Sequence, residues 1–214
     1  MTREEAEKRL ARARLARLSP VDRAEQLEVM TLEGWSDAPG WKALNPEVRA
    51  ELENGALEHP ATDERYDPVL LLWLRSQLGG STNAYLEAGL REEGLFTTPV
   101  VGPEPRLEAC PCCGLATLGE RSSYEICRVC WWEDDGQDNA KADTVLGGPN
   151  YHLSLTQARA NFLRHGISDP AREDLLAHRD PVEKYARARE FALSSGGDEL
   201  IEKGTSWTSR AFKL

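Results

Sequence analysis

The chain has 214 residues, a formal net charge of −10 and an apolar share of 40%, which allows one large domain or two small ones and excludes wholesale disorder. The longest apolar run, around residues 69–74, is far too short to cross a bilayer, and the first residues lack the apolar stretch of a secretory signal. The sequence therefore predicts a soluble, cytoplasmic protein with no membrane partner, whose acidity opposes binding to the phosphate backbone of nucleic acids.

Positive charge gathers at the N-terminus. Residues 1–18 carry six basic and three acidic side chains, so the rest of the chain has a net charge of −13. Alanine, leucine, arginine and glutamate dominate this stretch and favour a helix. A solvated helix face with Glu–Lys and Glu–Arg pairs explains the charge most simply. The alternatives are docking onto the acidic remainder of the chain itself and docking to an acidic partner.

Residues 1–94 are predicted to form a helical domain. A capping residue followed by proline marks the start of a helix, because proline fits the first helical turn. Such starts occur at Ser19-Pro20, Asn45-Pro46 and Asp67-Pro68, and Ser81 or Thr82 marks a further one. The helix that begins at Pro20 is expected to end near Gly34, and the apolar run at 69–74 is expected to lie at the centre of the domain.

Prolines and glycines gather over residues 94–106, a density typical of an extended connector. We therefore interpret residues 95–107 as a connector between two domains. The second domain is predicted to cover residues 108–168, and residues 169–214 are expected to form C-terminal helices and a tail.

All five cysteines lie within residues 110–130. Cys110 and Cys113 form one C-x-x-C pair, Cys127 and Cys130 form another, and thirteen residues separate the pairs. Two such turns can present four thiolates at the corners of a tetrahedron, which is the coordination that zinc prefers. The sequence therefore predicts that these four cysteines bind a structural Zn²⁺, with no open position left for catalysis.

Several alternatives to this zinc site stay open. A disulfide or redox pair is one, although the absence of a secretory signal disfavours it, and free core thiols are another. Rubredoxin-like iron binding uses the same ligands, so the spacing does not separate zinc from iron. Cys112 has three interpretations: a spare thiol, an alternative metal ligand, or a reactive thiol activated by the adjacent metal.

The segment between the cysteine pairs is predicted to form two short strands, 115–118 and 124–126, around a turn. With the cysteines they indicate a zinc ribbon. The predicted fold class is α+β and predominantly helical: a helical N-terminal domain, a small zinc-ribbon β-hairpin domain, and helices after it.

The segment after the ribbon is expected to be helical at first. Ser154 and Gln157 match a capping box at the start of a helix that should end at Gly166. Two more helices are expected to open at Asp169-Pro170 and Asp180-Pro181. From Ser194 onward the chain is expected to be loosely ordered, with Trp207 and Phe212 as anchors of the tail.

An acidic loop at residues 133–138 is the second candidate site. Its carboxylates are expected to cap backbone amides or to pair with Arg159, and the alternative is a hard cation such as calcium or magnesium. Of the two adjacent tryptophans, one indole is expected in the core and one at the surface, where it would mark a binding face. The candidate binding surface consists of Trp131, Trp132, Glu133, Asp134, Asp135 and Asp138.

The run Cys110-Pro111-Cys112-Cys113-Gly114 opens a series of motifs that resembles a known family. The series continues through Ser123–Cys127, Val129-Cys130, Trp132–Asp135, Gln137, Gly147-Gly148, Asn150, Ser154-Leu155, Ala158-Arg159, Asn161-Phe162 and Gly166. Over about residues 108–168 the chain resembles the Cys-rich CPCC domain, a short bacterial domain of unassigned function. The resemblance implies a fold unit of a ribbon, an acidic loop and one packed helix, and it implies no reaction.

The departures from that family pattern leave the metal ligands in place. Arg128 stands where a proline is common, Trp131 where a phenylalanine is common, and Pro149 where an alanine is common. Before residue 95 the chain shows no resemblance to a family.

Three hypotheses about function follow. The first is a non-enzymatic zinc-binding protein that acts as a protein-interaction module, with immunity proteins and antitoxins as examples and a basic protein as the partner. The second is a zinc ribbon that binds nucleic acid or regulates, which the net charge of −4 over residues 110–138 opposes. The third is an enzyme that uses the acidic loop or Cys112, for which no pair of nucleophile and base is visible.

Overall fold

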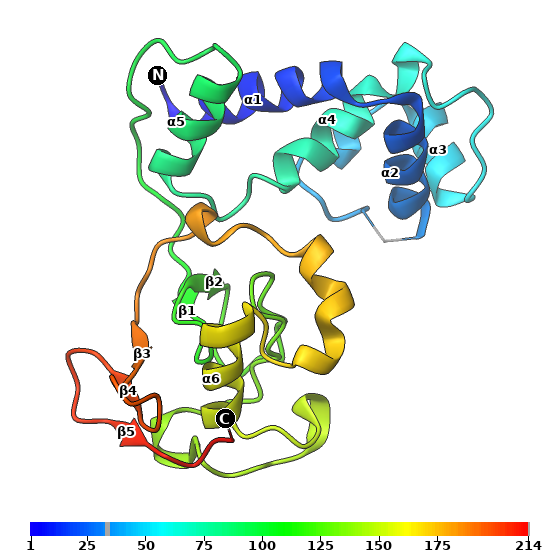
Figure 1. The fold of residues 1–214 in the computed structure, drawn as a ribbon. Coiled ribbons are helices and arrows are strands. Elements are labelled where there is room, and N and C mark those ends of the chain that lie inside the picture. Colours follow the sequence, from blue (N-terminus) through cyan, green and yellow to red (C-terminus); the bar gives the residue numbers. More distant parts are fainter. Residues whose placement is uncertain (33–34, 214) are drawn as a thin grey trace. The chain divides into compact units, whose positions relative to one another are not determined.

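The computed structural model of the protein describes residues 1–32 and 35–213 (Figure 1). The chain divides into two compact units. Unit 1 contains Met1–Gly79 and Asn83–Pro103, and unit 2 contains Gly80–Thr82 and Glu104–Leu214. The expected helix end near Gly34 lies outside the described residues. Among the described helices, none is long and apolar enough to cross a membrane.

Unit 1 is helical, as the sequence predicted. Its helices are α1 (Arg3–Arg17), α2 (Pro20–Leu32), α3 (Pro46–Glu53), α4 (Asp67–Ser76) and α5 (Asn83–Glu92). The caps explain where they begin. The Thr2 side chain accepts a hydrogen bond from the backbone N–H of Glu5 in α1, and Asn45 accepts one from the N–H of Glu47 in α3. Prolines occupy the first turns of α3 and α4.

The core of unit 1 is built around α4. Its side chains Val69 and Leu70 are fully buried and pack in a cluster with Leu27 of α2 and Trp41. A second cluster joins α1 and α5, where Leu10 of α1 packs with side chains of α5. The apolar run at 69–74 therefore lies at the centre of unit 1, as expected.

The predicted connector packs on unit 1 over its first part. Val100 is buried, and its N–H donates to the Glu87 carboxylate of α5 at 2.8 Å. Thr2 and Val101 form a parallel bridge, in which the Arg3 N–H donates to the Val101 carbonyl. The segment has no helix, and its side chains Leu95, Phe96 and Val100 pack against the cluster formed by α1 and α5.

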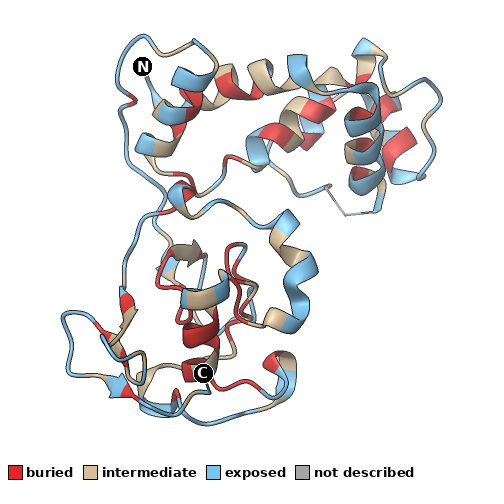
Figure 2. Cartoon of the chain, viewed as in Figure 1, coloured by how far each residue is buried: buried red, intermediate tan, exposed pale blue. Residues whose placement is uncertain are grey.

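Unit 2 combines two small antiparallel sheets with one α-helix. In the first sheet β1 (Glu108–Ala109) pairs with β2 (Ala116–Leu118), and in the second the order is β3 (Phe191–Leu193), β4 (Leu200–Glu202) and β5 (Thr208–Ser209). The helix is α6 (Leu155–His165). Figure 2 shows buried residues concentrated along α6 and in the loops beside it.

The first sheet differs from the predicted hairpin. Residues 116–118 form a strand as expected, but their partner is β1, which precedes the first cysteine pair. In the predicted strand 124–126, Ile126 forms only an isolated bridge with Glu133. The backbone turns left-handed at Ser122 and Tyr124, which prevents a regular strand there.

The region after α6 also differs from the prediction. The cap of α6 is confirmed, because the Ser154 side chain accepts from the Gln157 N–H at 3.1 Å. In place of the helix expected from Pro170, two short 3-10 helices cover Pro170–His178 and meet at a kink at Arg172, where the backbone is not helical. The helix expected after Asp180 is a single 3-10 turn (Val182–Lys184). The tail, expected to be loosely ordered, forms the β3–β4–β5 sheet.

Candidate metal centre

The first cysteine pair lies in a tight turn between β1 and β2. The Cys110 N–H donates to the Leu115 carbonyl at 2.8 Å, and the Gly114 N–H returns to the Cys110 carbonyl at 3.0 Å. Gly114 has a φ of 77°, a conformation that glycine adopts without steric cost. We call this turn knuckle 1 (residues 110–114).

The second pair repeats the same turn without a glycine. The Trp131 N–H donates to the Cys127 carbonyl at 2.8 Å, and the Cys127 N–H donates to the Trp132 carbonyl at 2.9 Å. Trp131 takes the place of Gly114 with a φ of 64°, which is strained for a bulky residue. We call this turn knuckle 2 (residues 127–131). The sequence did not reveal this role of Trp131, because tryptophan rarely adopts the left-handed conformation.

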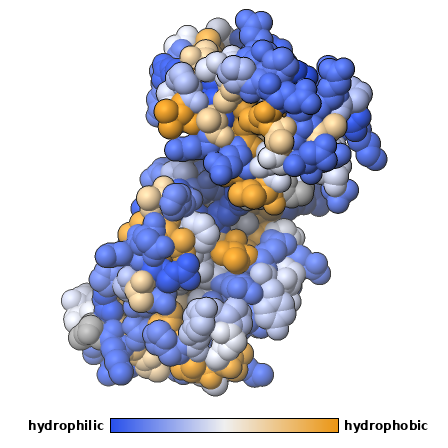
Figure 3. All heavy atoms as spheres, turned by 90° about the vertical axis from the view of Figure 1, so that its right-hand side faces the viewer, coloured by the Kyte–Doolittle hydropathy of each residue, from blue (hydrophilic) through white to orange (hydrophobic). Residues whose placement is uncertain are grey.

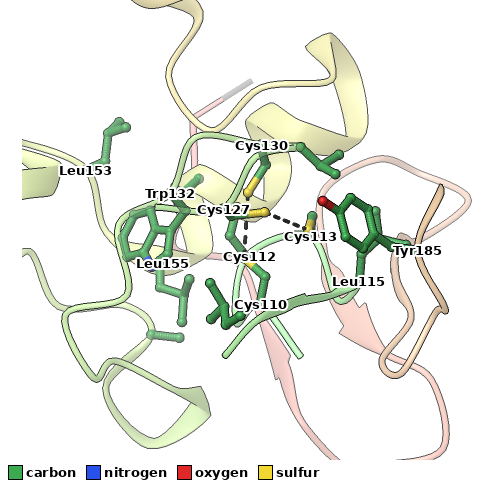
Figure 4. Close-up of a cluster of buried hydrophobic side chains, with 14 residues drawn as sticks. Cys110, Cys112, Cys113, Leu115, Cys127, Cys130, Trp132, Leu153, Leu155 and Tyr185 are labelled. Atoms are coloured by element: carbon green, nitrogen blue, oxygen red, sulfur yellow. Dashed lines mark hydrogen bonds between the residues drawn. The ribbon is translucent and has the colours of Figure 1, made fainter. Parts of the chain in front are cut away.

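The two knuckles bring four sulfur atoms together. The Sγ atoms of Cys110, Cys113, Cys127 and Cys130 all lie within 4.8 Å of one another, and all four residues are buried. Cys110 and Cys130 Sγ are 3.6 Å apart, and Cys113 and Cys127 Sγ are 3.7 Å apart, along the dashed lines of Figure 4. A disulfide bond requires about 2.05 Å between the sulfurs, so these pairs are not disulfides.

The sulfur spacing fits a tetrahedral metal ion. A Zn–S distance of about 2.3 Å implies about 3.8 Å between sulfurs at the corners of a regular tetrahedron. Two of the six separations, 3.6 and 3.7 Å, match that edge closely, and the other four are no longer than 4.8 Å. The four cysteines can therefore hold one metal ion in their present positions.

The protonation of the thiols points the same way. Burial raises the pKa of Cys110 and of Cys130. Burial acts to raise the pKa of Cys127 too, but hydrogen bonds from the other thiols and from the Thr117 hydroxyl, 3.1 Å from Cys127 Sγ, hold it well below its ordinary value. Without a cation, four buried thiols cannot all lose their protons, whereas metal binding requires them to.

Cys112 adjoins this group without belonging to it, and its side chain interacts with Cys130. Its exposed fraction is 1%, and it is not among the four clustered sulfurs. Figure 4 shows it beside the cluster, within the apolar packing of Leu115, Trp132 and Leu155. Burial of this degree favours the spare-thiol interpretation over the reactive one, because a reactive cysteine needs partial exposure.

Comparison with known proteins found a family match for the part of the chain that contains the four cysteines. Residues 108–184 match the model of the family described as Cysteine-rich CPCC. Residues before 108 match no family model. Searches among curated proteins and among solved structures found no match. We refer to residues 108–184 as the CPCC segment.

The later part of the CPCC segment holds knuckle 2. The Cys130 carbonyl accepts from the Ser168 N–H at 2.8 Å, and the Arg128 carbonyl accepts from the Asp180 N–H at 2.8 Å. The Trp131 indole N–H donates to the Leu175 carbonyl at 3.1 Å. The segment 168–180 therefore holds knuckle 2 through contacts at both of its ends and at Leu175.

Knuckle 1 is held by residues that follow the CPCC segment. The Gly114 carbonyl accepts from two N–H groups, Ala188 at 3.0 Å and Arg189 at 2.9 Å. The Ala116 N–H donates to the Ala186 carbonyl at 2.8 Å, which extends the contact along the chain. Residues 186–189 thus complete the centre, although the family match ends before them.

A buried arginine connects knuckle 1 to the C-terminal sheet. The Arg159 side chain is fully buried, and its Nε donates to the Pro111 carbonyl at 2.8 Å. Its guanidinium lies between the rings of Phe191 and Trp207, 4.1 and 4.5 Å from their centroids. Burial, together with the nearby Arg189, lowers the pKa of Arg159 to about 10. The positive charge next to knuckle 1 suits a centre of four thiolates on a divalent ion, which carries a net charge of −2.

The acidic loop is a structural element of unit 2. Asp134 is fully buried and accepts from Arg121 Nε at 2.8 Å and from the Ser122 N–H at 2.7 Å. Asp138 accepts from Arg189 Nη2 at 2.8 Å and also pairs with Arg159. The expected pairing with Arg159 is therefore present. Arginines pair with two of the four carboxylates of the loop, Asp134 and Asp138, whereas Glu133 and Asp135 form no ion pair with an arginine among the described residues. Within the described residues the cysteines are the one group able to hold a metal.

The candidate binding surface needs correction. Trp132 and Asp134 are fully buried, because the indole fills the core beside the cysteines and the carboxylate is enclosed by its donors. Neither can touch a partner. Trp131, Glu133, Asp135 and Asp138 are half-buried. Trp132 lies in the core, as expected of one of the two indoles, and Trp131 is half-buried rather than fully exposed.

Proposed function

We propose that the protein is a non-enzymatic binding protein whose CPCC segment is held together by a structural Zn²⁺. The cysteines at 110, 113, 127 and 130 are the ligands. The observation that supports this most directly is the match between the sulfur separations and a zinc–thiolate tetrahedron. Four thiolates complete the zinc coordination, so no position remains for a substrate or an activated water.

The proposed partner is a basic protein. The exposed side chains that adjoin the acidic loop are Tyr124, which is 60% exposed, and Ile126, which is 52% exposed. The Tyr124 N–H donates to the Asp134 carbonyl, and Ile126 bridges to Glu133, so both lie along the loop. An aromatic and an aliphatic side chain next to acidic groups fit a basic protein surface. Immunity proteins and antitoxins are the kind of small acidic protein that acts in this way.

On the face that Figure 3 presents, hydrophobic residues form separate patches between hydrophilic ones. The net charge of −10 opposes nucleic acid as the partner.

Elemental analysis of protein purified without added metal tests the metal centre. The expected result is one zinc per chain, lost in the variant Cys113→Ser and retained in the matched control Cys112→Ser. Iron in place of zinc would contradict the metal identity, and metal-free protein with oxidised thiols would contradict the whole centre.

Affinity capture with the variant Tyr124→Ser/Ile126→Ser tests the partner surface. The expected result is a basic protein retained by the wild type and lost by the variant, with zinc content unchanged. A partner that binds both proteins equally would contradict this surface.

A further inference from the structure

A groove follows the line where α1 meets α4 in unit 1. It consists of two adjoining hollows of about 580 and 220 Å³. Arg12 of α1 and Leu71 of α4 line both hollows, and Lys8, Leu72 and Arg75 line the smaller one. The two hollows adjoin at Arg12 and Leu71, and we call them together the α1–α4 groove.

The floor of the α1–α4 groove is apolar. α4 places Val69, Leu70 and Leu74 in the core of unit 1. Its other side carries Leu71 and Leu72, which remain half-buried and line the groove. A helix that is apolar around its circumference is normally covered on all sides. α4 therefore has an apolar side that unit 1 covers only in part.

The rim of the groove is positively charged. Arg12 and Arg75 are exposed, and within the described part of the chain neither lies in an ion pair. Lys8 pairs with Glu4 at 2.6 Å, and Glu4 and Glu5 lie near Arg75 and Arg12, so the positive charge of the rim is partly offset. Of the described lining residues only Asp67 is acidic, and it pairs with Arg23 at 2.6 Å. A groove with a net positive rim stands out in a chain of net charge −10.

We propose that the α1–α4 groove binds an acidic amphipathic helix of a partner protein. The apolar face of that helix would cover Leu71 and Leu72, and its carboxylates would pair with Arg12 and Arg75. Helices commonly dock in grooves through one apolar face, and complementary charge selects the partner. Nucleic acid fits less well, because none of the described lining residues is aromatic and the floor offers no stacking platform.

Fluorescence anisotropy with a labelled synthetic peptide tests this proposal on the full chain. The peptide has leucines at helical i, i+4 and i+7 spacing and glutamates on its other face. One comparison peptide has the same composition with the leucines redistributed, and another has lysine in place of glutamate. The acidic amphipathic peptide should bind, and the other two should bind about tenfold more weakly or worse, since like charges and a lost apolar face both weaken docking.

Charge-reversal variants locate the binding site. Arg12→Glu/Arg75→Glu should weaken binding of the acidic peptide about tenfold or more, and Arg12→Gln/Arg75→Gln should weaken it less. Arg14→Glu is the matched control, because Arg14 lies on α1 but does not line the groove. Circular dichroism checks that the variants fold.

Several outcomes would overturn the proposal. They are equal binding by wild type and the Arg12/Arg75 variants, equal binding of the redistributed or lysine peptide, stronger binding of a DNA duplex through the same arginines, and self-association of the chain that depends on them. Zinc content is measured in the same samples, so that a failure of peptide binding can be distinguished from a failure of the proposed metal centre.

Discussion

At the scale of single residues, the metal centre depends on two left-handed positions. Gly114 closes knuckle 1 and Trp131 closes knuckle 2, each by the same backbone hydrogen bond to the first cysteine of its pair. The two positions differ in what surrounds them. The backbone of Arg189 packs directly on Gly114, whereas the Trp131 side chain is anchored through its indole.

Gly114→Ala should destabilise unit 2 by about 3 kcal/mol or more. A Cβ at this position would lie 2.2 Å from the Arg189 carbonyl oxygen. Because this oxygen belongs to the backbone, a change of side-chain rotamer cannot relieve the clash. Urea unfolding with tryptophan fluorescence measures the loss.

Gly147→Ala is the matched control, because Gly147 has nearly the same φ, 75°, and nothing within 4 Å of its Cβ position. It should cost only about 1 kcal/mol, the cost of the left-handed backbone alone. Equal losses at the two positions would contradict the close contact with Arg189.

Trp131→Gly should be more stable than Trp131→Ala by about 1 kcal/mol, since only glycine relieves the left-handed strain. Both variants lose the indole and its hydrogen bond to Leu175. At most positions the alanine variant of a protein is more stable than the glycine variant. A more stable glycine variant at residue 131 would therefore indicate left-handed backbone strain there. Thermal unfolding of the two variants with zinc bound provides the comparison. An alanine variant at least as stable as the glycine variant would show that Trp131 is not strained.

At the scale of elements, polar side chains fasten segments that carry little regular structure. Arg159 of α6 holds the C-terminal sheet through Phe191 and Trp207. In unit 1, Glu87 of α5 holds the extended segment at Val100 and pairs with Arg91 at 2.9 Å. These contacts give short strands and a proline-rich segment defined positions.

The Glu87 contact makes part of the stability depend on pH. The hydrogen bond from the Val100 N–H, aided by Arg91, holds the pKa of Glu87 below its ordinary value. Because the folded pKa is depressed, the contribution is complete above the unfolded pKa of about 4.3 and is lost as the pH falls below it through the folded pKa.

Glu87→Gln should therefore reduce stability at pH 7 and have little effect at pH 3. An NMR titration of the Glu87 carboxyl carbon should give a pKa below about 4.3. Amide exchange at Val100 should accelerate in the variant at neutral pH. An ordinary pKa for Glu87 would contradict the contact.

At the scale of the whole molecule, each unit has its own core. The cysteines and Trp132 form the core of unit 2, whereas unit 1 has two clusters of leucine, valine and aromatic side chains. Only unit 2 contains the candidate metal centre. Unit 1 should therefore fold without metal, and unit 2 should not.

Removal of metal should affect one of two unfolding transitions. Calorimetry of the full chain should show a transition that a strong chelator shifts to lower temperature and one that it leaves in place. The Cys113→Ser variant should reproduce the chelated trace, and Cys112→Ser should not. A single transition that shifts as a whole would contradict separate folding of the two units.

Features that depend on neighbouring residues in the chain were predictable from the amino-acid order. α2 and α3 begin at the proline that follows the predicted capping residue, whereas α4 begins one residue earlier than predicted, at Asp67 itself. Ser154 caps α6. The four cysteines were identified by spacing alone, because two C-x-x-C turns admit few arrangements. The CPCC resemblance was visible as well, since its motifs lie close together in the chain.

Features that depend on contacts between distant segments could not be predicted from the sequence and are known only from the structure. Strands β3, β4 and β5 have two or three residues each, too few for a periodic pattern, and the buried Arg159 supports the sheet from outside it. The burial of Trp132 in the core and the pairing of the buried Asp134 with Arg121 were also not predictable from the sequence. The reason is that burial and pairing depend on which segments meet in space, and a local pattern does not contain that information.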